Sequence, residues 1–462
     1  MLRKLGFKVS NLFLIMILVF ISFSLFKIFF YPVYIDEAIT YNDYVINGFW
    51  KSLSSYKEPN NHVLYSLLLV AFTKLPIETL IAMRLLNLCI SLFIIVVMYR
   101  FLQKKFSFEA SIIGVCVFMF SYFFLFYTIF ARGYLIIILC TISYFFILEE
   151  MRRQITNKHF ITMGLVTVLG FCTVPIFLYV FLSFIVIIIF RFVNKVYPLK
   201  LIFLFMITFF ISGICVFLFY LPILLHDGIN AIVNNKWTAI LCYNDVFSYL
   251  KNSWSGFYDK IFGVKSIFIM LFIVLTCVYL IIKSKQSRLY LIENLIFIFL
   301  PFIFILLHKV VPGVRTWSYL TVPFTFILTF FLEYFFKYFI IKRSTKLILV
   351  LVLCFLLGSF QLIIFHRSHK ISGHINDFYY GKVAEFLINN NVEHICFLNG
   401  FRSYENVIYK FHLNKVNDNY KSNKDNNIKC LTFVGYITSI NTLKVKRILY
   451  IDKKINICVY QL

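Results

Sequence analysis

Apolar residues along this chain gather in long, nearly unbroken runs rather than in short periodic stripes. A helix needs about 20 mostly apolar residues to cross the roughly 30 Å hydrocarbon core of a bilayer. Such runs lie at residues 11–31, 77–99, 110–130, 133–149, 160–174, 175–192, 201–222, 264–282, 289–307, 317–336 and 347–365. The pattern therefore predicts an α-helical polytopic membrane protein with about eleven transmembrane helices.

The charges between the runs predict how the chain is oriented. Alternate connections hold 19 Lys and Arg residues against three acidic residues. These connections are residues 1–10, 100–109, 149–160, 191–200, 283–288 and 337–346. The positive-inside rule places them in the cytoplasm, together with the amino terminus. The outer loops are then 32–62 and 223–263, and the carboxyl terminus lies outside after an odd number of spans.

The tail at 366–462 differs from the rest of the chain. It is polar and Asn/Lys-rich, with 14 basic and 7 acidic residues. Strand-like runs lie at 394–398, 428–434, 447–451 and 456–461, and helical stretches lie at 377–389 and 403–412. This alternation predicts a small extracytoplasmic α/β domain that follows a transmembrane domain at 1–365.

Composition excludes several classes of protein. The chain is 61% hydrophobic and 14% charged, with a mean hydropathy of +0.86, whereas soluble chains are about 45–50% apolar and about 25% charged. A soluble enzyme, a disordered chain and a coiled coil are therefore ruled out. The net charge of +25 would suggest a nucleic-acid partner. Cytoplasmic connections carry +16 of it and the tail carries +7, so the excess is topological and no nucleic acid is expected.

The first outer loop carries the most informative acids. Asp36 and Glu37 are adjacent and follow the first span closely. Ionisable groups at the rim of a membrane are costly and are functional candidates by default. A carboxylate there could act as a base toward a substrate that enters from the outer leaflet. The simpler interpretation is a solvated loop that begins with ordinary helix-capping acids.

Basic residues lie on the same side, where Lys and Arg are normally rare. They are Arg132, Lys309 and Arg315. The guanidinium fork suits phosphate oxygens, although snorkelling to lipid head groups explains any one of these cations alone. A further arginine, Arg84, lies inside the second span and is expected to pair with Glu78 or with a neighbouring helix.

The long outer loop 223–263 holds aromatic residues interleaved with acids, among them Trp237 and Trp254. Aromatic faces pack against sugar rings or lipid, so this loop is a candidate acceptor-binding or lid segment. An interfacial aromatic belt explains the same pattern equally well.

In its order of motifs, the chain resembles the membrane-integral glycosyltransferases of the C-type (GT-C) fold. It is most similar to the bacterial branch with protein O-mannosyltransferases and lipid A aminoarabinose transferases, glycosyltransferase family 39. The matching segments are Asp36-Glu37, Asn61-His62-Val63-Leu64-Tyr65, Ala82-Met83-Arg84-Leu85, Ala131-Arg132-Gly133-Tyr134, and Arg315 through Tyr319 to Pro323. The sequence departs from the family at Val63 and Leu64, where the family carries prolines.

The resemblance implies a reaction and a role for each candidate. A hydroxyl acceptor on a lipid, glycan or protein takes a sugar from a polyprenyl-phosphate donor in the bilayer, with inversion. Asp36 is then the base, and Glu37 orients the acceptor or a metal. Arg132, Lys309 and Arg315 would bind the donor phosphate. The acceptor or substrate would contact Glu58, His62, Tyr65, Trp237 and Trp254.

The resemblance leaves metal dependence open and implies a location. Asp36, Glu37, Glu58 and His62 could supply oxygen and nitrogen ligands to a divalent metal ion, which some members of the family use and others do not. The implied location is the cell envelope, as a multi-pass protein of a bacterial inner membrane.

Two other classes of protein compete with a glycosyltransferase. An O-antigen polymerase or ligase also has many spans, but relies mainly on basic residues in a large late loop. A transporter or flippase of lipid-linked glycans predicts internal repeats and charges near the membrane midplane. The acids directly after the first span favour the glycosyltransferase over both.

Overall fold

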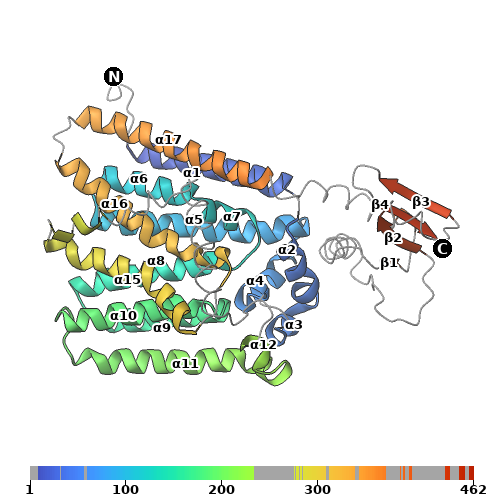
Figure 1. Ribbon diagram of the computed structural model, residues 1–462, viewed down its shortest axis with the longest axis horizontal. Coiled ribbons are helices and arrows are strands. Elements are labelled where there is room, and N and C mark those ends of the chain that lie inside the picture. The colour runs from blue at the N-terminus through green and yellow to red at the C-terminus, as the bar shows by residue number, and fades with distance from the viewer. Residues whose placement is uncertain are drawn as a thin grey trace.

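The computed structural model describes residues 9–31, 33–56, 60–233, 285–308, 312–338 and 343–370, isolated helical positions between 275 and 282 and from 386 to 390, and four strands in the tail. Its main body is a bundle of long helices that run roughly side by side (Figure 1). Seven of the described helices are long and apolar enough to cross a membrane, or eight if one bent pair forms a span. The chain is a multi-pass membrane protein, as its sequence predicts.

The long helices follow the predicted apolar runs. They are α1 (Val9–Phe30), α5 (Thr79–Lys105), α6 (Phe108–Phe120), α7 (Tyr122–Ile129), α8 (Tyr134–Arg153), α9 (Asn157–Thr173), α10 (Phe177–Val193), α11 (Leu201–His226), α15 (Lys285–His308), α16 (Thr321–Tyr338) and α17 (Arg343–Lys370). A short 3-10 helix, η2 (Val314–Leu320), leads into α16. The expected span at 264–282 lies almost wholly outside the described residues, so the count of eleven stays a prediction.

One predicted span is broken. The run at 110–130 forms α6 and α7, which meet at Ser121 with a bend of 54°. Ser121 has extended backbone angles, and its hydroxyl donates to the Phe118 carbonyl at 2.8 Å. The bend therefore comes from a local turn that an apolar sequence pattern does not reveal.

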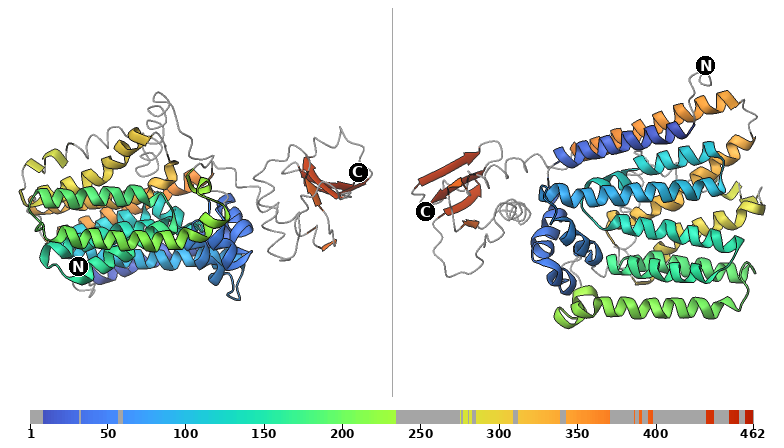
Figure 2. Two further views of the ribbon diagram at one scale, coloured as in Figure 1. Left: turned by 90° about the horizontal axis from the view of Figure 1, so that it is seen from below. Right: turned by 180° about the vertical axis from the view of Figure 1, so that it is seen from behind.

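The first outer segment was expected to be a loop, but it is mostly helical. It forms α2 (Ile35–Thr40), the π-helical η1 (Tyr41–Val45), α3 (Gly48–Ser54) and, just beyond it, α4 (Val63–Phe72). These short elements gather at one end of the bundle (Figures 1 and 2). They fold there because apolar side chains such as Val33, Ala38 and Val45 are buried against the long helices.

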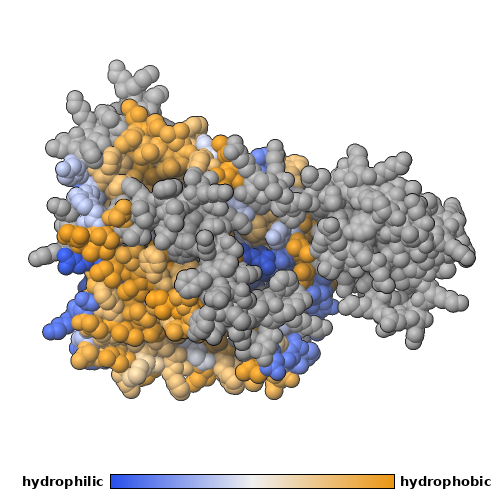
Figure 3. All heavy atoms as spheres, viewed as in Figure 1, coloured by the Kyte–Doolittle hydropathy of each residue, from blue (hydrophilic) through white to orange (hydrophobic). Residues whose placement is uncertain are grey.

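The outer surface of the bundle is apolar. Along α11, Phe203, Phe210 and Phe217 are 64%, 71% and 56% exposed. Hydrophobic residues cover much of the visible face of the bundle (Figure 3). Exposed apolar area on this scale would be unfavourable in water, and it matches a helix face that lies against lipid.

The tail contains a small sheet. Its strands are β1 (Ile395–Phe397), β2 (Thr432–Tyr436), β3 (Arg447–Asp452) and β4 (Ile457–Gln461), in the order β1-β2-β4-β3. β1 pairs with β2 in parallel, and the other two pairings are antiparallel. The strands lie at the predicted runs, with β2 shifted toward the carboxyl terminus. The helical stretches lie almost wholly outside the described residues, so the α/β domain as a whole stays a prediction.

Candidate active site

Glu37 and Arg84 form a fully buried ion pair at the end of the bundle. Both side chains are 0% exposed. Arg84 Nε donates to Glu37 Oε1 at 3.0 Å, and Nη2 donates to Oε2 at 2.7 Å. Two backbone amides also donate hydrogen bonds to this carboxylate, that of Tyr34 at 2.8 Å and that of Ala131 at 2.7 Å. Four donors thus saturate Glu37, which a buried charge requires.

The third guanidinium nitrogen of Arg84 binds the carboxyl-terminal end of α1. Its Nη1 donates to the carbonyls of Tyr31 at 2.8 Å and Ile28 at 3.2 Å. These carbonyls lie at and just beyond the end of α1, where helical acceptors lack partners within the helix. Arg84 therefore ties α5 to both α1 and α2. Arg84 thus pairs with Glu37 on the neighbouring helix α2, which is one of the two alternatives that the sequence suggested.

Asp36 lies beside Glu37 but has a different environment. Its carboxylate pairs with the Nη1 of Arg315 on η2. The Asp36 side chain keeps 11% of its surface exposed, and that of Arg315 keeps 46%. This pair is therefore the part of the charged cluster that a substrate could reach. The structure brings together two residues that lie 279 positions apart in the sequence.

Polar contacts hold the backbone of α2 in place beneath Asp36. The Asn60 side-chain amide donates to the Asp36 carbonyl at 3.0 Å, and the Thr40 hydroxyl donates to the same carbonyl at 2.8 Å. The Asn60 carbonyl and the Thr40 hydroxyl in turn accept hydrogen bonds from Arg132 Nη1, at 3.1 and 3.2 Å. The position of Asp36 thus depends on Arg132.

Arg132 also pairs with His62. Arg132 is 3% exposed and His62 is 1% exposed. Arg132 Nη2 donates to His62 Nε2 at 3.2 Å, since the guanidinium is a donor only. Burial, and next to it the charge of Arg132, hold the pKa of His62 well below its ordinary range. The imidazole is therefore neutral, and its Nδ1 is buried without a hydrogen-bond partner in the structure.

Gly133 allows α8 to approach this histidine. A Cβ at position 133 would lie 2.9 Å from His62 Nδ1, from Tyr65 Cβ and from Thr173 Cγ2. The Tyr134 ring then packs edge-on against His62, with ring centroids 4.6 Å apart. Tyr65 itself is 1% exposed, so it belongs to the packing beneath the site rather than to its accessible surface.

Residues that the sequence analysis did not single out connect the site to the bundle. The Asn87 side-chain amide donates to the carbonyls of Tyr127 at 2.7 Å, Phe130 at 2.6 Å and Arg132 at 3.3 Å. The Tyr127 hydroxyl donates to the Arg315 carbonyl at 2.8 Å. An asparagine within an apolar run is a signal for such a role, because polar groups at membrane depth need partners.

Four of the predicted site residues cannot be placed. Glu58, Lys309, Trp237 and Trp254 lie outside the described residues, so their roles stay predictions.

The described acids and histidine do not fit a metal site. Glu37 is saturated by protein donors, Asp36 pairs with Arg315, and His62 faces a guanidinium. Within the described part of the chain, no group of three or more His, Cys, Asp or Glu side chains could hold a metal ion. Glu58, the fourth ligand that the sequence suggested, lies outside the described residues, so metal dependence stays a prediction.

Together these observations define a polytopic membrane protein with two adjacent ion pairs, Glu37–Arg84 and Asp36–Arg315, at one end of its helical bundle. No protein-family model matches the chain, and no curated protein matches it in sequence. Solved structures do match. The crystal structure of ArnT from Cupriavidus metallidurans in the apo state aligns over 96% of this chain and 97% of that chain, with a TM-score of 0.64 and 10% identity.

A second ArnT structure, bound to undecaprenyl phosphate, aligns over the same shares of the two chains with a TM-score of 0.59 and 9% identity. The chain therefore has the ArnT fold, and the resemblance to GT-C glycosyltransferases is confirmed at the level of the fold. At this low identity the match establishes the fold alone.

Proposed function

We propose that this protein transfers a sugar from a polyprenyl-phosphate-linked donor to a hydroxyl acceptor at the outer face of a bacterial inner membrane. The observation that carries the proposal is the Asp36–Arg315 pair, in which Arg315 is exposed and Asp36 is largely buried. The pair adjoins the fully buried Glu37–Arg84 pair. The Asp36–Arg315 pair supplies a carboxylate for the acceptor and a guanidinium for a phosphate. The ArnT structure bound to undecaprenyl phosphate supports a polyprenyl-phosphate ligand for this fold.

In the proposed reaction Asp36 is the general base. The acceptor hydroxyl gives its proton to the Asp36 carboxylate while its oxygen attacks the anomeric carbon. The bond from that carbon to the phosphate oxygen breaks on the opposite face, and polyprenyl phosphate leaves with the bonding electrons. A single direct displacement inverts the configuration at the anomeric carbon.

Arg315 couples donor binding to the release of the base. In the structure its guanidinium pairs with Asp36. A donor phosphate competes for the same nitrogens, because Arg binds phosphate oxygens through charge-assisted, bidentate hydrogen bonds. The exposed Arg315 side chain can turn to it, and the guanidinium then stabilises the charge that gathers on the leaving phosphate.

Arg132 and Glu37 act through other residues. Arg132 spends its Nη donors on Thr40, Asn60 and His62, so it positions α2 and adds positive potential near the donor phosphate. Glu37 anchors α2 to α5 through its ion pair with Arg84. Of the two described cations that the sequence suggested for the phosphate, Arg315 is therefore our candidate for direct contact, and the same role for Lys309 stays a prediction.

Neither competing class gains support from the structure. Helix α2, which carries Asp36, lies at one end of the bundle (Figure 1) and not at its middle, where a transporter would bind its substrate. A polymerase or ligase would leave the Asp36 carboxylate beside Arg315 without a role.

The proposal is tested in cells by mass spectrometry of envelope glycolipids and glycoproteins with and without the protein. We expect loss of one defined sugar mass in its absence, restored by wild type and by Lys51→Ala, a control that removes a cation from α3. Arg315→Ala should fail to restore it at equal protein level. An unchanged set of envelope glycans, or full restoration by Arg315→Ala, would contradict the proposal.

A further inference from the structure

A polar pocket lies at the end of the bundle opposite to Asp36. Its volume is about 480 Å³. It is lined by Lys104, Lys105, Phe106, Glu149, Arg152, Arg153, Tyr290, Phe330, Glu333, Tyr334 and Lys337. These residues come from the carboxyl-terminal ends of α5, α8 and α16, from the residue that follows α5, and from the amino-terminal part of α15. The 20 residues of α8 separate this pocket from Arg132, a rise of about 30 Å or one hydrocarbon thickness.

The lining of the pocket carries an excess of positive charge. Five cations face two acids there, a net charge of +3. Both acids are already neutralised by the protein. Glu149 pairs with Lys105 at 2.8 Å and Arg152 at 3.6 Å, and Glu333 pairs with Lys337 at 3.0 Å and accepts the Ser107 amide at 2.6 Å. Glu150, outside the lining, pairs with Lys104. When it is counted, the cations around the pocket exceed the acids by two charges, which an anion could neutralise.

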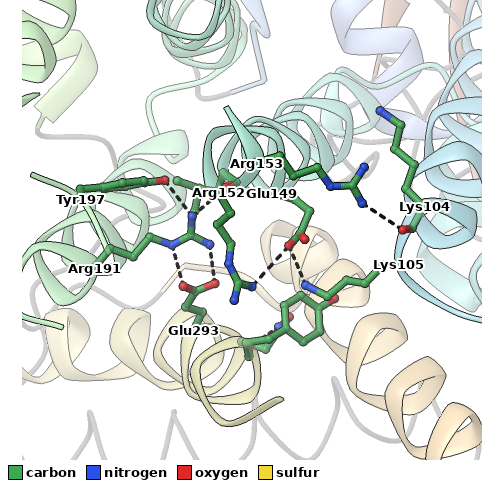
Figure 4. A network of polar contacts seen from close by, with 11 residues as sticks. Lys104, Lys105, Glu149, Arg152, Arg153, Arg191, Tyr197 and Glu293 are labelled. Carbon is green, nitrogen blue, oxygen red and sulfur yellow. Dashed lines mark hydrogen bonds and ion pairs between the residues drawn. The ribbon is translucent and has the colours of Figure 1, made fainter. Parts of the chain in front are cut away.

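Contacts with the protein also hold the remaining cations. The Lys104 ammonium pairs with Glu150 at 3.1 Å. One Arg153 nitrogen donates to the Lys104 carbonyl at 3.1 Å (Figure 4). Beside them a buried clamp keeps α10 and α15 in register, in which Arg191 Nε and Nη2 donate to Glu293 at 2.6 and 2.8 Å (Figure 4). These contacts hold together the helices at this end of the bundle, which carry the cations.

The other lining residues suit a lipid. Phe106, Tyr290, Phe330 and Tyr334 supply aromatic surface beside the cations, and Lys105 Nζ lies 3.3 Å from the centre of the Tyr290 ring. The pocket lies between the ends of helices that cross the membrane, at the level of lipid head groups. A basic pocket in that position lies nearer to the phosphate groups of membrane lipids than to phosphate ions in solution.

We propose that this pocket binds the phosphate headgroup of an anionic diacyl phospholipid from the leaflet on that side of the membrane, the cytoplasmic leaflet by the charge distribution. The site is separate from the proposed sugar-transfer site by the thickness of the bilayer. Lipid binding there requires neither donor nor acceptor, so its test and the test of sugar transfer have independent outcomes.

The experiment measures lipid binding to the purified full chain by native mass spectrometry, with phosphatidylglycerol and phosphatidylcholine as probes. We expect wild type to prefer phosphatidylglycerol by about tenfold or more. The test variant combines Lys104→Gln, Arg153→Gln and Lys337→Gln, which removes the net charge of the lining. A matched control combines Arg100→Gln, Lys158→Gln and Lys200→Gln, three exposed cations of the same side that do not line the pocket.

The test variant should lose most of the preference for phosphatidylglycerol, and the control should keep it. Equal losses in both variants would show a general surface-charge effect and overturn the proposal. Displacement of phosphatidylglycerol by an equal concentration of inorganic phosphate would also overturn it, since the ligand would then be a soluble anion. If the triple variant unfolds, Lys337→Gln alone decides, because that side chain is 76% exposed and outside the core; an unchanged preference would contradict the proposal.

Discussion

Asp36 and Glu37 are adjacent carboxylates whose surroundings assign them different tasks. Glu37 is enclosed by Arg84 and two backbone amides, whereas Asp36 faces an exposed guanidinium. The sequence identifies both as candidates, because acids are rare at the rim of a membrane. The resemblance makes Asp36 the base, but the sequence does not reveal the physical reason, since the partners Arg84 and Arg315 lie 47 and 279 positions away. Burial decides which acid can meet a substrate.

The buried pair makes a prediction at this scale. Glu37→Gln should leave Arg84 as an uncompensated buried charge and lower the free energy of unfolding by about 3–5 kcal/mol. Arg84→Met should have a similar effect, and the double variant should lose less than the two single losses combined. Unfolding by denaturant, followed by tryptophan fluorescence, measures the three variants. A Glu37→Gln protein as stable as wild type but inactive would instead make Glu37 a catalytic residue.

At the scale of elements, apolar runs predict the long helices well because a spanning segment must be both apolar and long. The same reasoning cannot find the short helices of the first outer segment, because they are too short to span and are stabilised by packing against the bundle. It also misses the bend between α6 and α7 at Ser121. Residues 131–134 illustrate the limit: the sequence indicates Arg132, but the close approach at Gly133 is a property of the packed structure.

The close approach of Gly133 to His62 can be tested by a substitution that adds one methyl group. In Gly133→Ala, the new Cβ would lie 2.9 Å from atoms of His62, Tyr65 and Thr173, and we expect a loss of stability of about 1–3 kcal/mol from overpacking. Gly213→Ala is the matched control within α11, because nothing lies within 4 Å of its new Cβ. Thermal unfolding compares the two variants. Equal melting temperatures would show that α8 does not pack on His62 as described.

At the scale of the whole molecule, the charged residues lie at the two ends of an apolar bundle. One end carries the Asp36 cluster, and the other carries the basic pocket around Arg153. The uneven distribution of Lys and Arg predicts which end is cytoplasmic. This orientation is the premise of both proposals, since sugar transfer is placed outside and phospholipid binding inside.

Labelling of introduced cysteines tests the orientation. The background variant replaces the four cysteines of the predicted outer segments with Ser: Cys242, Cys396, Cys430 and Cys458. A membrane-impermeant maleimide should then label Asp43→Cys in intact cells, and Lys158→Cys only after the membrane is opened. Both positions are exposed in the structure. The reverse pattern would place the Asp36 cluster in the cytoplasm and contradict the account.

The most direct test of the central claim is the rate of sugar transfer by the purified protein from a polyprenyl-phosphate sugar. Asp36→Asn should lower this rate by about 100- to 10,000-fold, because the general base is lost. The melting temperature of this variant should equal that of wild type. Asp43→Asn, which changes an exposed carboxylate of the same outer segment, should transfer sugar at the wild-type rate. Wild-type transfer by Asp36→Asn would contradict the account.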